Sequence, residues 1–240
     1  MLSSEFLECL AQGQREFSDI RLQYADLSGR HFVGLTFRNC KFYFVILRHC
    51  NFKDVVFEGC EFFFTSFGDS KFESAEFRRC QLDYSGFGDA IVENSRMVDT
   101  RLSWHNFIDA KIGGLELMNC TEFMVLRNIS ELTPKIIESG LRSLQPIISQ
   151  LDFDMQEKVK AIMNAFAQQH GLELPDISNK TQRNAYGELQ GSHAKGYQLL
   201  DAFVDTAIRI YGEKNLYQSK NIYDINQNIA KKDPRDRRLP

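Results

Sequence analysis

Six cysteines, five histidines and a row of aspartates are the residues of this 240-residue chain best suited to chemistry. The cysteines could hold a soft metal, but none belongs to a Cys-x-x-Cys pair of the kind typical of zinc sites. The histidines are scattered, and there is no glycine-rich phosphate loop, His-Glu-x-x-His motif or nucleophile elbow. The sequence therefore predicts no catalytic residue, no metal and no cofactor. It predicts a protein that is not an enzyme, with residues 123–240 left open.

Three aspartates recur at intervals of twenty residues, at Asp69, Asp89 and Asp109, in the contexts FGD, FGD and FID. Asp is common at chain corners because its carboxylate accepts hydrogen bonds from turn N–H groups. We favour this interpretation, since like charges stacked at strand spacing repel one another. The alternative is a functional acidic column, either a DNA-like row of negative charge or a cation site.

The interval between these aspartates is part of a longer repeat. An apolar residue occupies every fifth position from Leu27 to Leu117, and a second, mostly small series lies two residues before it. A period of five fits neither a helix nor a strand, so it predicts short straight edges separated by corners. Four edges would close a coil of twenty residues, and successive coils would stack as parallel strands about 4.8 Å apart. The apolar series is Leu27, Phe32, Phe37, Phe42, Leu47, Phe52, Phe57, Phe62, Phe67, Phe72, Phe77, Leu82, Phe87, Val92, Met97, Leu102, Phe107, Ile112 and Leu117.

The repeat units ADLSG at 25–29, CNFKD at 50–54 and AEFRR at 75–79 resemble the pentapeptide repeat family, with its small–polar–Leu/Phe–x–x pattern. The resemblance extends over residues 20–120 and implies a right-handed quadrilateral parallel β-helix. Some members of that family resemble duplex DNA in shape and charge, bind type II topoisomerases and protect them from inhibitors. One function that the resemblance implies is therefore a DNA-mimicking modulator of gyrase.

Steps of twenty residues give the columns of the predicted coil. One inward column contains Cys40, Cys60, Cys80, Thr100 and Cys120. Parallel inward side chains hold their Cβ atoms slightly too far apart for a disulfide. We therefore interpret these cysteines as small core residues rather than as disulfides or a ladder of metal ligands.

One outward edge of the predicted coil is aromatic. Small residues in neighbouring columns, such as Ser66 and Gly86, would form a flat shelf beside it. A continuous exposed apolar patch usually marks an interface. The pattern thus predicts a surface that receives a helix, either from the chain's own C-terminal part or from a protein partner, including a second copy in a homodimer. The predicted aromatic stripe consists of Tyr24, Tyr43, Phe44, Phe63, Phe64, Tyr84 and Trp104.

The two ends of the chain have helical rather than five-residue periodicity. Residues 1–19 predict a helical cap with Ser4 as its N-cap, followed by the β-helix over 20–122. Residues 123–240 predict an α-helical domain, with helices near 131–151, 154–169 and 182–211 and a mobile polar tail.

The net charge of −3 argues for neither strong nucleic-acid binding nor a strongly acidic DNA mimic, and nucleic acid is not expected as a partner. No apolar run is long enough to span a membrane, and the N-terminus lacks the pattern of a signal peptide, which predicts a cytoplasmic protein. We expect a non-enzymatic protein-interaction scaffold or regulator. The alternatives are the topoisomerase modulator and an enzyme or effector activity in residues 123–240.

Overall fold

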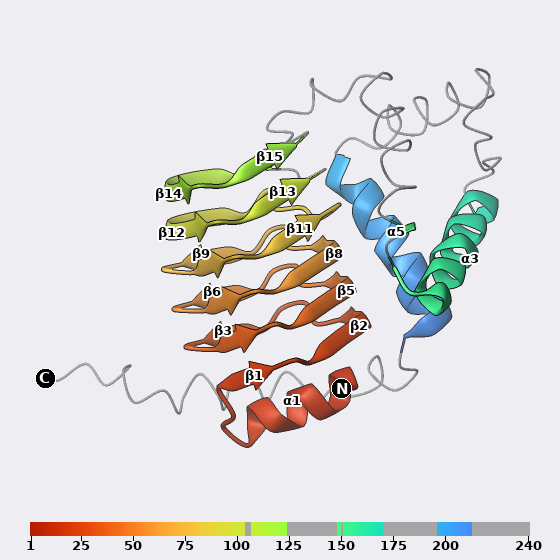
Figure 1. The fold of residues 1–240 in the computed structure, drawn as a ribbon, viewed down its shortest axis with the longest axis horizontal. Helices are drawn as coiled ribbons and strands as arrows, with labels where there is room; N and C mark the ends of the chain where they lie inside the picture. The colour runs from red at the N-terminus through yellow and green to blue at the C-terminus, as the bar shows by residue number, and fades with distance from the viewer. Residues whose placement is uncertain (104–106, 124–147, 150, 170–195, 213–240) are drawn as a thin grey trace, which may run out of the picture.

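The computed structural model describes residues 1–103, 107–123, 148–149, 151–169 and 196–212. A rod of stacked strands has one helix across its N-terminal end and two helices along one side (Figure 1). The helices are α1 (Ser3–Ala11), α3 (Phe153–Gln169) and α5 (Gly196–Tyr211). The strands are β1 (Glu16–Ser18), β2 (Arg21–Asp26), β3 (His31–Val33), β4 (Thr36–Arg38), β5 (Lys41–Ile46), β6 (Asn51–Lys53), β7 (Val56–Glu58), β8 (Glu61–Ser66), β9 (Lys71–Glu73), β10 (Glu76–Arg78), β11 (Gln81–Asp83), β12 (Ile91–Val98), β13 (Arg101–Ser103), β14 (Lys111–Met118) and β15 (Thr121–Phe123).

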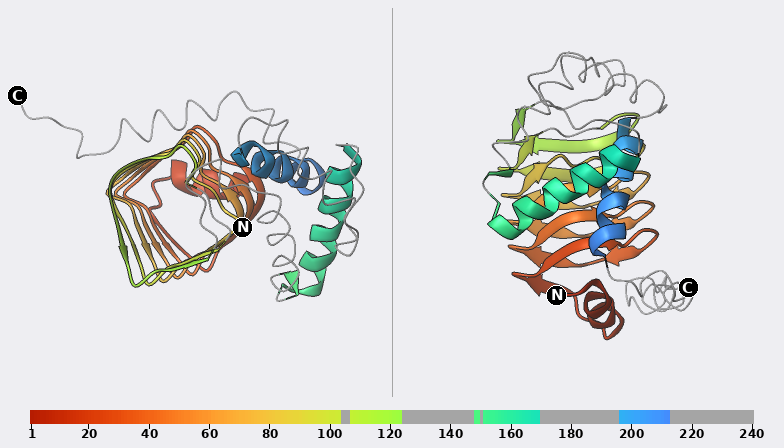
Figure 2. Two further views of the ribbon diagram at one scale, coloured as in Figure 1. Left: turned by 90° about the horizontal axis from the view of Figure 1, so that it is seen from above. Right: turned by 90° about the vertical axis from the view of Figure 1, so that its right-hand side faces the viewer.

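The strands pair in parallel with a constant offset of one coil. Phe37 lies opposite Phe57, and Phe42 lies opposite Phe62. The coil is four-sided in cross-section when it is viewed along the rod (Figure 2). One sheet has the strand order β15-β13-β11-β8-β5-β2, and the other runs from β1 through β12 to β3. The predicted fold class, a quadrilateral parallel β-helix followed by α-helices, is confirmed.

The interior of the coil is filled by the predicted apolar series. Phe57 is buried, and its ring stacks on Phe37 at 5.1 Å and on Phe77 at 4.8 Å between ring centroids. The same ring meets Phe62 edge to face at 5.3 Å. Each phenylalanine therefore has partners both along the stack and across the coil. Offset and edge-to-face aromatic pairs of this kind add stability beyond the area that they bury.

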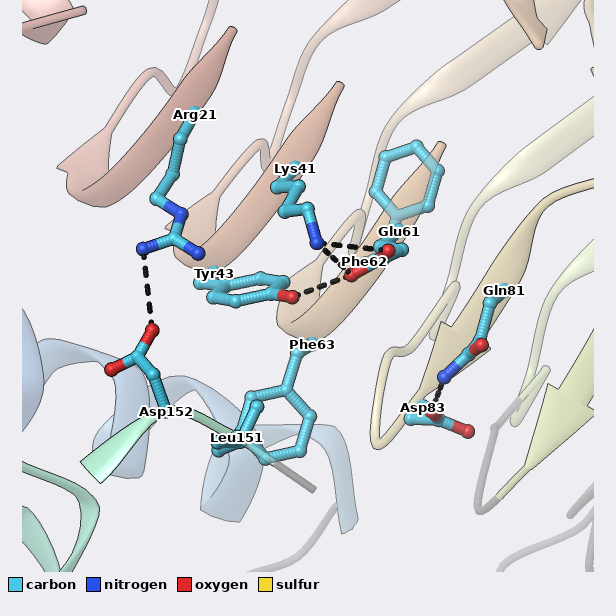
Figure 3. Close-up of a pocket in the computed structure, with 10 residues that line it drawn as sticks. All are labelled: Arg21, Lys41, Tyr43, Glu61, Phe62, Phe63, Gln81, Asp83, Leu151 and Asp152. Carbon is cyan, nitrogen blue, oxygen red and sulfur yellow. Dashed lines mark hydrogen bonds and ion pairs between the residues drawn. The ribbon is translucent and has the colours of Figure 1, made fainter. Parts of the chain in front are cut away.

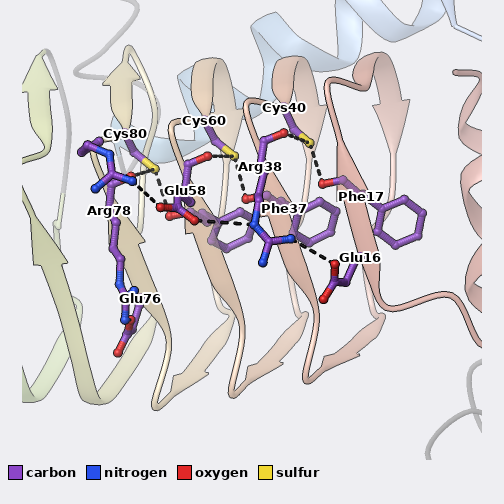
Figure 4. Close-up of polar contacts among 12 residues, drawn as sticks. Glu16, Phe17, Phe37, Arg38, Cys40, Glu58, Cys60, Glu76, Arg78 and Cys80 are labelled. Carbon is purple, nitrogen blue, oxygen red and sulfur yellow. Dashed lines mark hydrogen bonds and ion pairs between the residues drawn. The ribbon is translucent and has the colours of Figure 1, made fainter.

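The small series also connects successive coils through hydrogen bonds. The Thr65 hydroxyl donates to the Phe42 carbonyl at 2.9 Å, and the Ser70 hydroxyl donates to the Leu47 carbonyl at 2.7 Å. The Cys60 thiol donates to the Phe37 carbonyl at 3.4 Å in the same manner (Figure 4). These positions therefore favour a side chain that is a hydrogen-bond donor as well as a small one. Like the rest of the cysteine column, Cys60 is a free thiol.

The corners of the coil have left-handed backbone. Within the described residues, the residue two positions after a central apolar residue has a positive φ, for example +53° at Asn39 and +63° at Gly59. Gly, Asn and Asp tolerate this conformation better than other residues. Gly, Asn or Asp accordingly fills most of the described corners, although His49, Ser74 and Arg79 also adopt this conformation.

Helix α1 covers the N-terminal end of the rod. Its Phe6 is buried, and the ring meets Phe17 edge to face at 4.9 Å. The prediction that Ser4 is the N-cap is wrong, because the helix begins at Ser3 and Leu2 is its N-cap. The Leu2 N–H instead donates to the Glu5 carboxylate at 2.8 Å. The Glu5 carboxylate in the first turn thus satisfies the N–H of the N-cap residue, which is one half of a capping box.

The helices after the coil agree in part with the sequence prediction. Helix α3 occupies 153–169 where 154–169 was expected, and α5 occupies 196–211, the last part of the predicted 182–211. The predicted helix at 131–151 and the predicted tail lie almost entirely outside the described residues. No helix in the described part of the chain is long and apolar enough to cross a bilayer.

Candidate functional site

The aromatic stripe lies on the side of the rod that faces α3 and α5. Trp104 lies outside the described residues, and Tyr84 is partly buried. The other five stripe residues are at most 8% exposed. We call the six described members the aromatic flank: Tyr24, Tyr43, Phe44, Phe63, Phe64 and Tyr84.

Helix α5 packs directly on the flank, and α3 packs against both. Phe203 of α5 lies 4.8 Å from Phe64 and 6.1 Å from Phe44 between ring centroids. Phe166 of α3 meets the same Phe203 edge to face at 5.5 Å. One phenylalanine of α5 therefore connects the outer surface of the rod to the second helix. In the view along the rod, α5 lies between the coil and α3 (Figure 2).

The flank and the helices form a second apolar core outside the coil. On the helix side its fully buried members include Val159 and Ile162 of α3 and Val204 of α5. Tyr24 keeps a polar contact at the edge of this core, because its hydroxyl donates to the Met155 sulfur at 3.2 Å. Burial raises the pKa of this Tyr24 hydroxyl above its ordinary value. The hydroxyl therefore stays protonated and remains a donor.

Four flank residues occupy the left-handed corners that favour glycine or asparagine. The φ angles are +53° at Tyr24, +56° at Phe44, +49° at Phe64 and +51° at Tyr84. A bulky residue in this conformation is a backbone outlier that costs on the order of 1–3 kcal/mol, and such outliers cluster at functional sites. The rings stack in a row, with Phe44 and Phe64 5.3 Å apart. Packing against α5 offsets the strain of the corners.

The small columns beside the flank let α5 approach the rod closely. Ser66 of the shelf is buried, and α5 contacts β2, β5 and β8. The end of α5 is equally close, since a Cβ on Gly212 would lie 2.9 Å from the Tyr24 carbonyl oxygen. The shelf thus acts as a seat for a helix, which is the packing that its small residues predict.

Polar residues at the edge of the flank line a hollow of about 320 Å³ (Figure 3). The Lys41 ammonium donates to the Glu61 carboxylate at 3.0 Å, and the Tyr43 hydroxyl donates to it at 2.6 Å. Burial alone would raise the pKa of Glu61, but these hydrogen bonds and the positive charges of Lys41 and Arg21 together hold the pKa below its ordinary value. Asp152, which precedes α3, faces Arg21 across the hollow at 3.7 Å.

The acidic column lies at corners on another edge of the rod. Asp69, Asp89 and Asp109 have φ angles of +56°, +55° and +58°. The left-handed backbone accounts for Asp at these positions. Asp69 pairs with Arg48 at 2.5 Å, so its charge is compensated.

Charges elsewhere on the rod are balanced between coils. Arg38 pairs with Glu16 at 3.1 Å and with Glu58 at 3.7 Å (Figure 4), and Lys53 pairs with Glu73 at 3.1 Å. Opposite charges on neighbouring coils therefore compensate one another at these positions. Within the described residues, no cluster of three His, Cys, Asp or Glu could hold a metal ion.

The polar hollow was not anticipated from the sequence, although one column contains a signal. Its residues are Gln23, Tyr43, Phe63, Asp83 and Ser103, so an acid follows two aromatic residues in a buried column. Such a break in a column would have marked the edge of the flank. Leu151 and Asp152, which complete the hollow, lie far away in the sequence and gave no such signal.

The fold and the flank define a repeat protein of the parallel β-helix class with helices packed on one side. Residues 30–107 match the family model described as a pentapeptide repeat region. This part of the chain is therefore a pentapeptide repeat domain, as its sequence resemblance implied. No curated protein matches the chain.

Several solved structures are similar to the β-helix. The pentapeptide repeat protein Rfr23 from the cyanobacterium Cyanothece 51142 has 12% identity over 45% of this chain and 87% of its own, with a TM-score of 0.42. HetL from Nostoc sp. strain PCC 7120, a pentapeptide repeat protein involved in heterocyst differentiation regulation, has 12% identity over 50% and 94%, with a TM-score of 0.25. A trypsin-treated variant of QnrB1, a plasmid-mediated fluoroquinolone resistance protein, has 19% identity over 44% and 64%, with a TM-score of 0.33. No functional conclusion follows from likenesses this weak.

Proposed function

We propose that this protein is a non-enzymatic interaction scaffold whose β-helix seats α-helices on the aromatic flank. The observation that carries the proposal is the second apolar core, in which the flank and the faces of α3 and α5 bury one another. Rods of this kind are rigid because every strand pairs with the coil before or after it. A rigid surface with a defined aromatic row holds a helix in one position.

The backbone of the flank supports a role in recognition rather than in folding alone. A coil can be closed with Gly, Asn or Asp at every corner, as it is at Gly59 and Asn39. The aromatic residues at Phe44 and Phe64 strain the same corner and are not needed to fill the interior. Their role is on the outside, where Phe203 of α5 packs against both rings.

A peptide that corresponds to α5, residues 196–212, tests whether the flank is a receptor for helices. Val204 and Ile208 are buried against the rod, so the full chain with Val204→Asp and Ile208→Asp should release its own helix. We expect the labelled peptide to bind this double variant but not the parent, as measured by fluorescence anisotropy.

Two additional substitutions in the double variant serve as matched controls. Phe44→Ser removes a flank ring and should abolish binding, whereas Lys53→Ser on another side of the rod should leave it unchanged. Failure of the peptide to bind, or binding that Phe44→Ser does not weaken, would contradict the proposal. Sedimentation of the parent over a dilution series then distinguishes helices seated within one chain from helices exchanged in a homodimer.

A DNA-mimicking modulator of a type II topoisomerase is the alternative proposal. It requires an extended negative surface, and Asp69, Asp89 and Asp109 are its candidate residues. The pairing of Asp69 with Arg48 and the alternating ion pairs of the rod favour the scaffold instead. A supercoiling assay with purified gyrase separates the two, because a scaffold leaves supercoiling unchanged and a mimic inhibits or protects it.

A further inference from the structure

The polar hollow has the features of a ligand site that neither the coil nor the helix seat requires. It lies over β2, β5, β8 and β11 and is closed on one side by Leu151 and Asp152 (Figure 3). Its volume of about 320 Å³ suits a small molecule or a very short peptide. Tyr43, Phe63 and Leu151 give it an apolar wall.

Asp83 is the most unusual residue of this hollow. It is only 2% exposed, and its Oδ2 atom accepts hydrogen bonds from Arg101 at 2.7 Å and from Gln81 at 2.6 Å. Its Oδ1 atom has no partner among the described residues. A buried carboxylate oxygen that accepts no hydrogen bond destabilises the folded protein, so a donor is expected beside it. A ligand that carries an ammonium or N–H group would supply it.

The opposite end of the hollow holds two cations, Arg21 and Lys41, and Lys41 is already bonded to the Glu61 carboxylate at 3.0 Å. Arg21 and Lys41 belong to β2 and β5, while Asp83 belongs to β11, three coils away from Arg21. The Asp152 carboxylate approaches Arg21 to 3.7 Å, which is too far for a hydrogen bond. The Arg21 guanidinium also lies 5.4 Å from the Tyr43 ring centroid, and its side chain is 41% exposed. It can therefore receive a carboxylate without breaking a hydrogen bond.

The spacing of the two ends sets the length of the ligand. Three strand spacings of about 4.8 Å place Arg21 and Asp83 about 14 Å apart along the rod. An extended chain covers about 3.3–3.6 Å per residue, so a peptide of three or four residues spans this distance. We propose that the hollow binds a short zwitterionic peptide, with its ammonium group at Asp83 and its carboxylate at Arg21.

Calorimetric titration of the full-length protein with the tripeptide Ala-Leu-Ala tests this proposal. We expect saturable binding that weakens about tenfold or more when the peptide is N-acetylated, since a charge-assisted hydrogen bond is lost. Asp83→Asn should weaken the free peptide by a similar factor. Asp54→Asn removes an exposed corner carboxylate between β6 and β7, which do not line the hollow, and should leave binding unchanged.

The other end provides a test that does not depend on a buried residue. Arg21→Ala removes a partly exposed side chain and should weaken the free peptide but not its C-terminal amide, which lacks the carboxylate. The parent protein should bind the free peptide at a peptide concentration of about 10 mM, roughly the weakest affinity that such a site would have. If it does not, water alone satisfies Asp83 and the proposal is overturned. Equal binding of the free, acetylated and amidated peptides also overturns it.

Discussion

Inside the coil, Phe57 packs against phenylalanines one coil before and one coil after it, whereas on the flank Phe64 packs against a helix from a distant part of the chain. Both rings are buried, and both stack on a neighbour one coil away. The inner ring has ordinary strand backbone, but the outer ring sits at a left-handed corner. The inner core is thus made by the repeat itself, and the outer core is made at some local cost to it.

This difference shows that one repeat can specify both the coil itself and a contact on its outer surface. The central and small positions specify the coil, because their apolar contacts and hydrogen bonds recur at every step of twenty residues. The outward positions are free to vary, so a row of similar residues there specifies a contact with something else. On this rod the contact is with α5 and α3.

The largest expected effect is on the inner core. Phe57→Ala would leave a cavity among Phe37, Phe62 and Phe77, and the paired strands around it cannot collapse to fill it. We expect the free energy of unfolding to fall by about 3–5 kcal/mol. Urea denaturation followed by circular dichroism measures this change, and a variant as stable as the parent would contradict the inward register.

The outer core should show a smaller loss with an unusual dependence on the replacement residue. Phe64→Ala removes the ring but keeps the strained corner at a φ of +49°, whereas Phe64→Gly removes the ring and relaxes the corner. We expect the glycine variant to be about 1 kcal/mol more stable than the alanine variant. At Phe57, where φ is not positive, the order of the two variants should be reversed. Parallel denaturation of all four variants makes the comparison.

The edge of the flank should depend on pH. Because the pKa of Glu61 is lower in the folded protein than in the unfolded chain, its carboxylate stabilises the fold above the ordinary Glu pKa of 4.5. This contribution is lost as the pH falls through the lowered pKa. Tyr43→Phe removes one of the donors that lower the pKa, and we expect a loss of about 1 kcal/mol at neutral pH. The difference in melting temperature between variant and parent should shrink under acidic conditions, and a constant difference would argue against the hydrogen bond.

The smallest effect is expected for a conservative change in the small series. Cys60→Ser keeps a donor at a position that Ser70 fills in another column, so we expect a change of less than about 1 kcal/mol. Cys60→Val has a similar size but no donor and should cost more. Thermal unfolding of the two variants compares them, and equal stability would mean that size alone selects these residues.

Burial raises the pKa of the Cys50 thiol to about 12, so this thiol should resist alkylation until the protein unfolds.

The coil could be predicted from the sequence because its determinants are local and repeated. The register from Phe37 to Phe57 to Phe77 follows from the five-residue period alone. The membership of the flank was also predictable, because Tyr24, Phe44, Phe64 and Tyr84 depart from the residues that corners prefer. What covers the flank could not be derived, since contacts such as Phe64 with Phe203 have no periodic signal. The start of α1 was missed because its N-cap is Leu2, which lacks the side-chain acceptor that N-cap residues usually have.

The coil of twenty residues has a consequence for how this protein can change in length. Insertion of a whole coil would lengthen the rod by about 4.8 Å and keep every later side chain on its original face. Insertion of a single unit of five residues would instead rotate everything after it by a quarter turn. Such an insertion between Phe44 and Phe64 would divide the flank between two faces, so α5 could no longer contact both rings. Gains and losses of sequence in this part of the chain should therefore come in steps of twenty.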